Sequence, residues 1–316
     1  MKPGTKSLQR ADYKRLIDAG TWEFIQQTES FYPSENATCP IEKQRESYDA
    51  MCRAFAKNPP GGVRVRNMQT GEVGLRVYEG ENPVATVLYI HGGGFILGGL
   101  ESHDDICAEL AWLTGFRVMA VDYRLCPEHP HPAQFLDCRA ALDRVLDEFD
   151  GNVVLAGDSA GANLAAALAH DARGRTERIK GQVLIYGAYG AARNLPSMHI
   201  HANAPLLSRA DVEYYRTMRF DGAEPALDPT CDPLTDTVFS NLPPSVVIAA
   251  ECDPLCDDSR AYFERLLAAG NKAALFTEPG LVHGFLRARK SVENATIGFE
   301  RIVGALTALA NDVWTY

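Results

Sequence analysis

The sequence lacks the features of a nucleic-acid-binding or membrane protein. Its 31 basic residues are outnumbered by 41 acidic ones, giving a formal net charge of −10, whereas nucleic acid and anionic lipid both require clustered positive charge. No uncharged run is long enough to cross a bilayer, and no apolar stretch follows the basic start MKPGTKSLQR, so no signal peptide is expected. We therefore expect a cytoplasmic protein with neither nucleic acid nor a membrane as partner.

Cysteine pairs, repeats and low-complexity tracts are also missing. The eight cysteines are scattered without a C-x-x-C pair, which is too dilute for a disulfide framework, so we expect reduced thiols. With 316 residues of which 46% are hydrophobic, the chain can bury a sizeable core, as one large α/β domain or as two smaller units.

Short β-rich runs follow an amphipathic helical region that ends at N-P-P-G-G, residues 58–62. Eight strands are predicted in the segments VRVRNM, GLRVYE, ATVLYI, FRVMAVDY, NVVLA, GQVLIY, SVVIAA and AALFTE. From ATVLYI onward these runs are continuously apolar, which is typical of central strands covered on both faces by helices. The alternation of strands with helical segments predicts an α/β fold with a mostly parallel sheet.

One connection is longer than a crossover requires. Residues 187–244 separate GQVLIY from SVVIAA, and Ser208 with Asp211 forms a capping-box pattern that opens a helix in SRADVEYYRTMRF. We expect residues 1–57 and the insertion 187–244 to form a helical cap. Residues 58–186 and 245–316 would then form the catalytic domain.

The candidate nucleophile is Ser159, in the G-x-S-x-G motif of residues 157–161. The motif lies between the strand NVVLA and the helical segment ANLAAALAH, which is the context of a nucleophile elbow. A strand that turns directly into a helix holds the serine in a strained conformation, and flanking glycines relieve the crowding. Asp158 precedes the serine within the same motif.

A serine hydroxyl needs an imidazole as base, and the imidazole needs a carboxylate to fix its tautomer. His283 follows the last predicted strand, whereas the other histidines after Ser159 fall in the elbow helix or in the insertion. In this fold class the order is serine, acid, histidine, with acid and base on loops after later strands. His283 is therefore the candidate base.

The candidate acid comes from a repeated tetrapeptide, C-D-P-L, at residues 231–234 and 252–255. Only the second copy follows a strand, so Asp253 is the candidate, and Asp232 is interpreted as a turn residue before proline. Asp253 could instead cap the next helix, but Asp257 and Asp258 are better placed for capping.

H-G-G-G at residues 91–94 ends the strand ATVLYI. Successive glycines let the main chain approach a ligand, and backbone N–H groups stabilise the oxyanion that forms when a serine attacks a carbonyl. The N–H of Ala160, just after the nucleophile, adds a donor at a helix N-terminus. The chain has neither G-x-x-x-x-G-K-[ST] nor G-x-G-x-x-G after a strand, so nucleotide binding is not expected.

These motifs together resemble a known family. HGGGF, DYRLCPEHPHPA (122–133), GDSAG, DPL (253–255) and HGF (283–285) are similar to the hormone-sensitive-lipase-like α/β-hydrolases, in matching order from about residue 60 to the end. HGGGFILG, YGAYG and AECDPLCDDSR are more similar still to bacterial acetyl esterases.

The resemblance implies the α/β-hydrolase fold, with an eight-stranded sheet whose second strand is antiparallel, under a helical cap. It places the oxyanion donors at the N–H groups of Gly93, Gly94 and Ala160, with His91 and Gly92 completing the motif. It also implies hydrolysis of short-chain carboxylic esters without a metal or organic cofactor, and it allows for a homodimer.

The leading hypothesis is a serine carboxylesterase that favours short acyl groups. Ser159 attacks the ester, His283 acts as base and then acid, and Asp253 orients the imidazole. Bulky residues are expected to fill an acyl pocket, namely Tyr186, Tyr189, Leu206 and Leu207.

Two alternatives come from other functional classes. Plant gibberellin receptors resemble the same family without the catalytic histidine, so a non-catalytic or dual-role regulator that binds a ligand or protein is one alternative. A metal hydrolase is the other, built on Glu128, His129 and His131, or on His199 and His201. Neither cluster has H-E-x-x-H spacing, so no metal is expected.

Overall fold

The fold is described from a computed structural model that covers residues 7–33, 39–81, 83–192, 194–223 and 227–316. Parts of the predicted cap ranges, at 1–6, 34–38, 193 and 224–226, lie outside the described residues. Among the helices that are described, none combines the length and the apolar character needed to cross a bilayer.

All eight predicted strands are present and form one sheet, in the order β1-β2-β4-β3-β5-β6-β7-β8. β2 runs antiparallel to its neighbours β1 and β4, and the other pairs are parallel. The predicted eight-stranded, mostly parallel sheet is confirmed. The strand bounds are β1 Arg64–Thr70, β2 Val73–Glu79, β3 Ala85–Ile90, β4 Arg117–Asp122, β5 Asn152–Asp158, β6 Ile179–Ile185, β7 Ser245–Cys252 and β8 Ala273–Val282.

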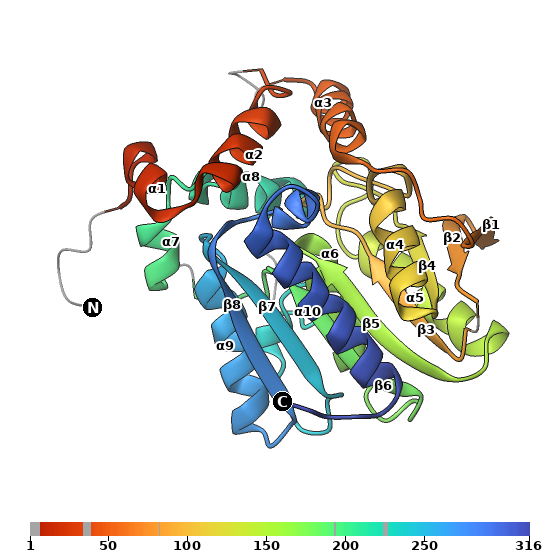
Figure 1. The fold of residues 1–316 in the computed structure, drawn as a ribbon. Helices are drawn as coiled ribbons and strands as arrows, with labels where there is room; N and C mark the ends of the chain where they lie inside the picture. Colours follow the sequence, from red (N-terminus) through yellow and green to blue (C-terminus); the bar gives the residue numbers. More distant parts are fainter. Residues whose placement is uncertain (1–6, 34–38, 82, 193, 224–226) are drawn as a thin grey trace.

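Helices cover both faces of this sheet (Figure 1). α4 and α10 pack into one hydrophobic core, and α5, α6 and α9 into the other. The bounds of the described α-helices are α1 Arg10–Leu16, α2 Ala19–Glu29, α3 Ile41–Phe55, α4 Asp104–Thr114, α5 Ala133–Glu148, α6 Ala160–Asp171, α7 Pro196–Ile200, α8 Arg209–Arg219, α9 Cys256–Ala268 and α10 Glu293–Ala310. Short 3-10 helices lie at η2 Glu101–His103, η3 Pro233–Thr235 and η4 Phe285–Ala288.

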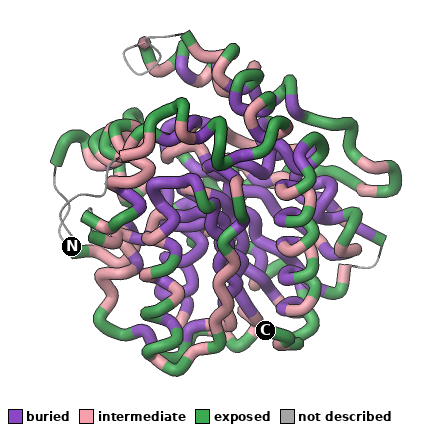
Figure 2. The backbone as a smooth tube through the Cα atoms, turned by 60° about the vertical axis from the view of Figure 1, so that its left-hand side comes forward, coloured by how far each residue is buried: buried purple, intermediate pink, exposed green. Residues whose placement is uncertain are grey.

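The continuous apolar runs arise because central strands are buried on both faces. In β3, Val87 and Tyr89 belong to one core, while Leu88 and Ile90 belong to the other, as the alternation of side chains along a strand requires. Figure 2 shows this layering, with buried strands inside and exposed positions gathered on the outer turns of the helices.

The N-terminal helices and the insertion lie together beyond the carboxyl ends of the central strands (Figure 1). They contact each other directly: the hydroxyl of Tyr13 lies 3.0 Å from Nδ1 of His201, and Gln44 donates to the hydroxyl of Tyr214 at 2.9 Å. The predicted capping box of α8 is also present, because Ser208 and Asp211 exchange backbone-to-side-chain hydrogen bonds. The division of the chain into cap and catalytic domain stays a prediction.

A buried ion cluster fixes the segment that follows β8. Arg289 is only 2% exposed, and it donates to Asp105 at 2.6 Å and to Glu109 at 2.9 Å, both on α4. The cluster therefore joins the segment after His283 to a helix that packs on the sheet. Such a group of buried charges is stable when every charge is paired. Loss of one member leaves the others buried without an opposite charge and without water.

Replacing Arg289 by methionine (Arg289→Met) should lower the free energy of unfolding by about 3 to 5 kcal/mol, because buried Asp105 loses its charged partner and Glu109 keeps only Lys290. Urea denaturation measures the change. The control is Arg64→Met, whose side chain is 79% exposed and pairs with Glu79 and whose loss should cost less than about 1 kcal/mol. Equal destabilisation by the two variants would contradict this reading of the cluster.

Candidate active site

Ser159 lies at a sharp turn between β5 and α6. Its backbone has φ +54° and ψ −118°, a conformation that a residue with a side chain rarely adopts. The helix can approach β3 this closely only because residue 161 is glycine: a Cβ there would lie 1.9 Å from the carbonyl oxygen of Ile90. The turn therefore places the Ser159 hydroxyl at the carboxyl edge of the sheet.

The structure brings the predicted serine, histidine and acid together. Nε2 of His283 lies 2.8 Å from Oγ of Ser159, and its Nδ1 lies 2.6 Å from Oδ2 of Asp253. Asp253 follows β7 and is fully buried, whereas the His283 side chain is 11% exposed. In the neutral imidazole, Nδ1–H donates to the carboxylate, which leaves Nε2 free to accept the serine proton.

Two further contacts hold this arrangement in place. The second oxygen of Asp253 accepts the backbone N–H of Leu255 at 2.8 Å, which fixes the carboxylate relative to the start of α9. The ring of Tyr186 lies against the imidazole of His283, with centroids 4.7 Å apart. The carboxylate and the imidazole are thus each held by a contact in addition to the hydrogen bond between them.

The other predicted aspartates have different contacts. Asp232 lies outside the serine–histidine–acid group and pairs both oxygens with Arg216, at 3.1 and 3.2 Å. The expectation that Asp257 and Asp258 cap α9 is wrong, since the N-cap is Leu255 and has no side-chain cap. Asp257 instead accepts the backbone N–H of Ser197 in α7 at 2.8 Å, and Asp258 accepts that of Tyr189, after β6, at 2.5 Å.

The glycine turn at residues 91–94 lies next to Ser159. Gly93 has φ +127°, and a Cβ there would lie 2.2 Å from the carbonyl oxygen of Leu97, so this backbone path requires glycine. The turn continues into Phe95, and the N–H of Ala160 lies at the N-terminus of α6. The oxyanion role of Gly93, Gly94 and Ala160 remains a prediction.

Asp158 and His91 support this turn from inside. Oδ1 of Asp158 accepts the N–H of Gly92 at 3.1 Å and the hydroxyl of Tyr89 at 2.9 Å. Burial alone would raise the pKa of Asp158, but the facing His103 and the hydroxyl of Tyr89 lower it below its ordinary value. His91 stacks on Tyr123 with centroids 4.2 Å apart, and burial lowers its pKa to about 3, so its imidazole is neutral.

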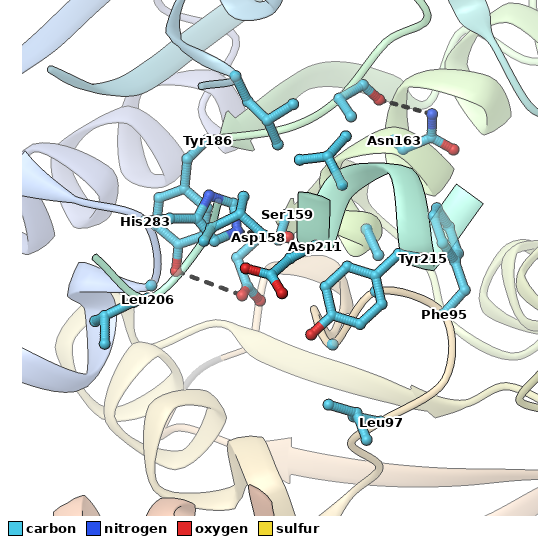
Figure 3. A pocket seen from close by; sticks show the side chains of 18 of the residues that line it. Phe95, Leu97, Asp158, Ser159, Asn163, Tyr186, Leu206, Asp211, Tyr215 and His283 are labelled. Carbon is cyan, nitrogen blue, oxygen red and sulfur yellow. Dashed lines mark hydrogen bonds between the residues drawn. The ribbon is translucent and has the colours of Figure 1, made fainter. Parts of the chain in front are cut away.

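Ser159 and His283 open onto a cavity of about 820 Å³. Figure 3 shows Tyr186, Leu206 and Tyr215 around Ser159. Of the four residues predicted to fill an acyl pocket, Tyr186, Leu206 and Leu207 line this cavity. Tyr189 does not belong to the lining, because its ring is fully buried and stacks on Tyr262 at 4.5 Å.

The cavity wall has an apolar part and a charged part. Phe24, Met51 and Ile106 belong to the apolar part, from the N-terminal helices and α4. The charged part includes Arg216 and Arg219, both on α8. No sequence motif marked these arginines, and their place in the wall depends on how α8 docks over the sheet.

The residues considered as metal ligands and judged unsuitable from the sequence have other contacts. Glu128 accepts a two-fold hydrogen bond from Arg45, with both distances 2.7 Å, and His201 contacts Tyr13. Within the described part of the chain one group gathers mixed ligand atoms, those of His131, Asp228 and Cys231, within 4.8 Å of one another. Burial raises the pKa of the Cys231 thiol to about 11, so this sulfur is protonated at neutral pH.

The fold and this site together define an α/β hydrolase. A family model described as alpha/beta hydrolase fold matches residues 87–287, and the chain belongs to this family. The resemblance found in the sequence is thereby confirmed.

Named relatives are esterases. Carboxylic ester hydrolase LipN of Mycobacterium tuberculosis is 34% identical over 288 residues, which cover 85% of this chain and 76% of that protein. Acetyl esterase of Salmonella typhi is 33% identical over 259 residues, covering 78% of this chain and 80% of its own length. Among solved structures, the hyperthermophilic esterase of the archaeon Pyrobaculum calidifontis aligns with a TM-score of 0.84 and 31% identity, covering 93% of this chain and 99% of that one.

The carboxyl group of Asp258, in the cavity wall, makes the free energy of unfolding depend on pH. Its carboxylate accepts the N–H of Tyr189 at 2.5 Å, yet burial raises its pKa to about 7 from an ordinary value of 3.8. Between these two pH values the unfolded chain has released the proton and the folded chain still holds it. The free energy of unfolding therefore falls as the pH rises through this window.

In the Asp258→Asn variant this part of the pH dependence should be missing. The slope that disappears is at most about 1.4 kcal/mol per pH unit, the value for one proton. Urea denaturation at pH 5, 6, 7 and 8 measures it, with Asp312→Asn as control because that side chain is 63% exposed. Parallel curves for wild type and Asp258→Asn would refute the assignment.

Proposed function

We propose that this protein is a serine carboxylesterase that hydrolyses esters of short, acetyl-type acyl groups through an acyl-enzyme. The observation that carries the proposal is the continuous chain of hydrogen bonds from Ser159 through His283 to Asp253. The names of the relatives, carboxylic ester hydrolase and acetyl esterase, support the same reaction. A homodimer and a cytoplasmic location remain predictions.

The first half-reaction transfers the acyl group to Ser159. As Oγ bonds to the ester carbonyl carbon, Nε2 of His283 takes the hydroxyl proton, and Asp253 stabilises the imidazolium that forms. The carbonyl oxygen becomes an oxyanion. Collapse of this intermediate breaks the bond to the alcohol, which leaves with the proton from His283.

The second half-reaction releases the acid. Water gives a proton to Nε2 of His283 while its oxygen bonds to the acyl carbon, and the bond to Oγ of Ser159 then breaks as that oxygen recovers a proton. We assign oxyanion stabilisation to the N–H groups of Gly93, Gly94 and Ala160, each donor contributing about 3 to 4 kcal/mol to the transition state. His91 takes no part in proton transfer, because it is buried and neutral.

Ser159→Ala should lower kcat for p-nitrophenyl acetate by roughly a thousandfold or more, since no acyl-enzyme can form. The matched control is Ser240→Ala, at an exposed position away from the cavity, which should keep wild-type activity. An organophosphate should label the wild-type peptide that contains Ser159 and should not label this peptide in Ser159→Ala. Activity of Ser159→Ala close to wild type would refute the mechanism.

The acyl preference is tested with acetyl, butyryl and decanoyl p-nitrophenyl esters. We expect kcat/KM to be highest for acetyl or butyryl, because Tyr186, Leu206 and Leu207 occupy the wall. Leu207→Ala should raise the ratio of decanoyl to acetyl hydrolysis by about tenfold, the effect of removing packed apolar volume. Tyr189→Phe is the control, because Tyr189 lies outside the lining. A decanoyl optimum in the wild type would contradict the proposal.

A further inference from the structure

The turn that carries Asp253 is held by a residue from the long connection between β6 and β7. Asp253 directly follows β7, and α9 begins shortly after it at Cys256. Ser197 lies in α7 of that connection, packs against this turn and is only 4% exposed. The candidate acid is therefore in contact with a segment that lies far from it in the sequence.

The hydroxyl of Ser197 makes one hydrogen bond as donor and one as acceptor. Its Oγ donates to the carbonyl of Pro254 at 2.7 Å, and it accepts the backbone N–H of Asp257 at 3.1 Å. The backbone N–H of Ser197 donates in turn to Oδ2 of Asp257 at 2.8 Å. Because the N–H of Asp257 supplies its own proton, the hydroxyl proton must point to the carbonyl of Pro254.

The peptide unit between Pro254 and Leu255 connects Ser197 to the candidate acid. Its carbonyl accepts the hydroxyl of Ser197, and its N–H, that of Leu255, donates to Oδ1 of Asp253 at 2.8 Å. A peptide unit is planar, so its C=O and its N–H can only turn together. Ser197 therefore holds the same peptide whose N–H orients the carboxylate of Asp253.

The other hydrogen bonds of this turn do not hold that peptide by its carbonyl. The N–H of Cys256 donates to the main-chain carbonyl of Asp253 at 3.1 Å, and the N–H of Ser259 donates to the carbonyl of Leu255 at 3.1 Å. Among the described residues, no backbone N–H donates to the carbonyl of Pro254. The orientation of the Pro254–Leu255 peptide thus depends on the Ser197 hydroxyl.

We propose that Ser197 is a positioning residue that holds the carboxylate of Asp253 in line with the imidazole of His283. No covalent bond of Ser197 changes during the reaction. Met198, its neighbour in α7, lines the cavity, so this short helix contacts both the space for the substrate and the turn of the acid. The inference rests on the proposed esterase function.

Replacing Ser197 by alanine tests the proposal on p-nitrophenyl acetate. Without the hydroxyl the Pro254–Leu255 peptide is free to turn, and the carboxylate loses its alignment. We expect kcat at pH 8 to fall by about tenfold to a hundredfold, the effect of a small misplacement of a catalytic group. Both half-reactions use the same imidazole, and Ser197 is not part of the cavity lining, so KM should stay within about twofold.

The pH profile distinguishes positioning from a loss of stability. The carboxylate of Asp253 stabilises the imidazolium of His283, so a misaligned carboxylate lets the imidazole release its proton at lower pH. The midpoint of the rise of kcat/KM with pH should therefore move down by about half a pH unit or more in Ser197→Ala. Partial unfolding would lower the rate without moving this midpoint.

The other titratable groups around the acid are the same in the wild type and in the variant. They come from α1, from the end of α7, and from β7 and α9: Tyr13, His201, Glu251, Cys252, Cys256, Asp257 and Asp258. A shift of the midpoint on removal of an uncharged hydroxyl therefore reports a change of geometry.

Ser245→Ala is the matched control, because Ser245 makes the same kinds of contact at the opposite end of β7. It is fully buried, its Oγ donates to the carbonyl of Pro243 at 2.8 Å, and it accepts from Nε2 of Gln182 at 2.8 Å. Urea denaturation should show that both variants are destabilised, whereas Ser245→Ala should keep the wild-type kcat and midpoint. An equal loss of kcat in the two variants, or a wild-type kcat and midpoint in Ser197→Ala, would overturn the proposal.

A second variant covers the case in which Ser197→Ala does not fold. The thiol of Ser197→Cys fills the same space and is a weaker donor, so kcat should fall and the midpoint should move in the same direction. Wild-type values in this variant would refute the positioning role.

The activity of the wild type separates this proposal from the proposed function. If the wild type hydrolyses p-nitrophenyl acetate and the Ser197 variants match it, only the positioning role is refuted. If the wild type neither hydrolyses the ester nor reacts with an organophosphate, the proposed esterase function fails, and the positioning role fails with it.

Discussion

The sharp turn from β5 into α6 is the constraint on which the site depends. It holds Ser159 at positive φ and needs the bare backbone of Gly161 against Ile90. Because the strands around it are parallel, their carboxyl ends meet at one edge. Asp253 after β7 and His283 after β8 therefore arrive beside the serine, although they are far from it in the sequence. Moving the serine off this edge would separate the hydroxyl from the imidazole.

Buried charges beneath the site, toward the sheet, have different kinds of partner from those above it, in the cavity wall. Beneath it, each oxygen of Asp158 has a hydroxyl or N–H donor, and Arg289 faces two carboxylates. These paired networks fix the glycine turn and the segment after His283. Above it, Arg219 is as deeply buried as Asp158, and it donates to the carbonyl of Cys231 and stacks on the ring of Phe95. Around Arg219 a carbonyl and an aromatic ring therefore stand where Arg289 has two carboxylates.

The sequence predicts best what local patterns control. The central strands were predicted because each is a continuous apolar run buried on both faces, whereas β1 and β2 were predicted from short β-rich segments. Ser159, His283 and Asp253 were found because each follows a strand, and strand order then determines where they meet. The contacts of Asp258, Tyr189 and the arginines were not predicted. They depend on how the insertion docks on the sheet, which is set by packing between distant segments and leaves no short motif.

The serine–histidine–acid group and the charged part of the cavity wall therefore come from different parts of the fold. Ser159, His283 and Asp253 stand on the sheet edge, where a change of one residue would disturb the serine turn, the glycine turn at residues 91–94 or the orientation of the imidazole. The charged wall stands on α8, whose first turn is fixed by its own capping box at Ser208 and whose later turns carry Arg216 and Arg219. These arginines are held by the insertion and by the glycine turn, since Arg216 pairs with Asp232 and Arg219 stacks on Phe95. α8 thereby contributes Arg216 and Arg219 to the wall that a substrate of the proposed esterase would contact.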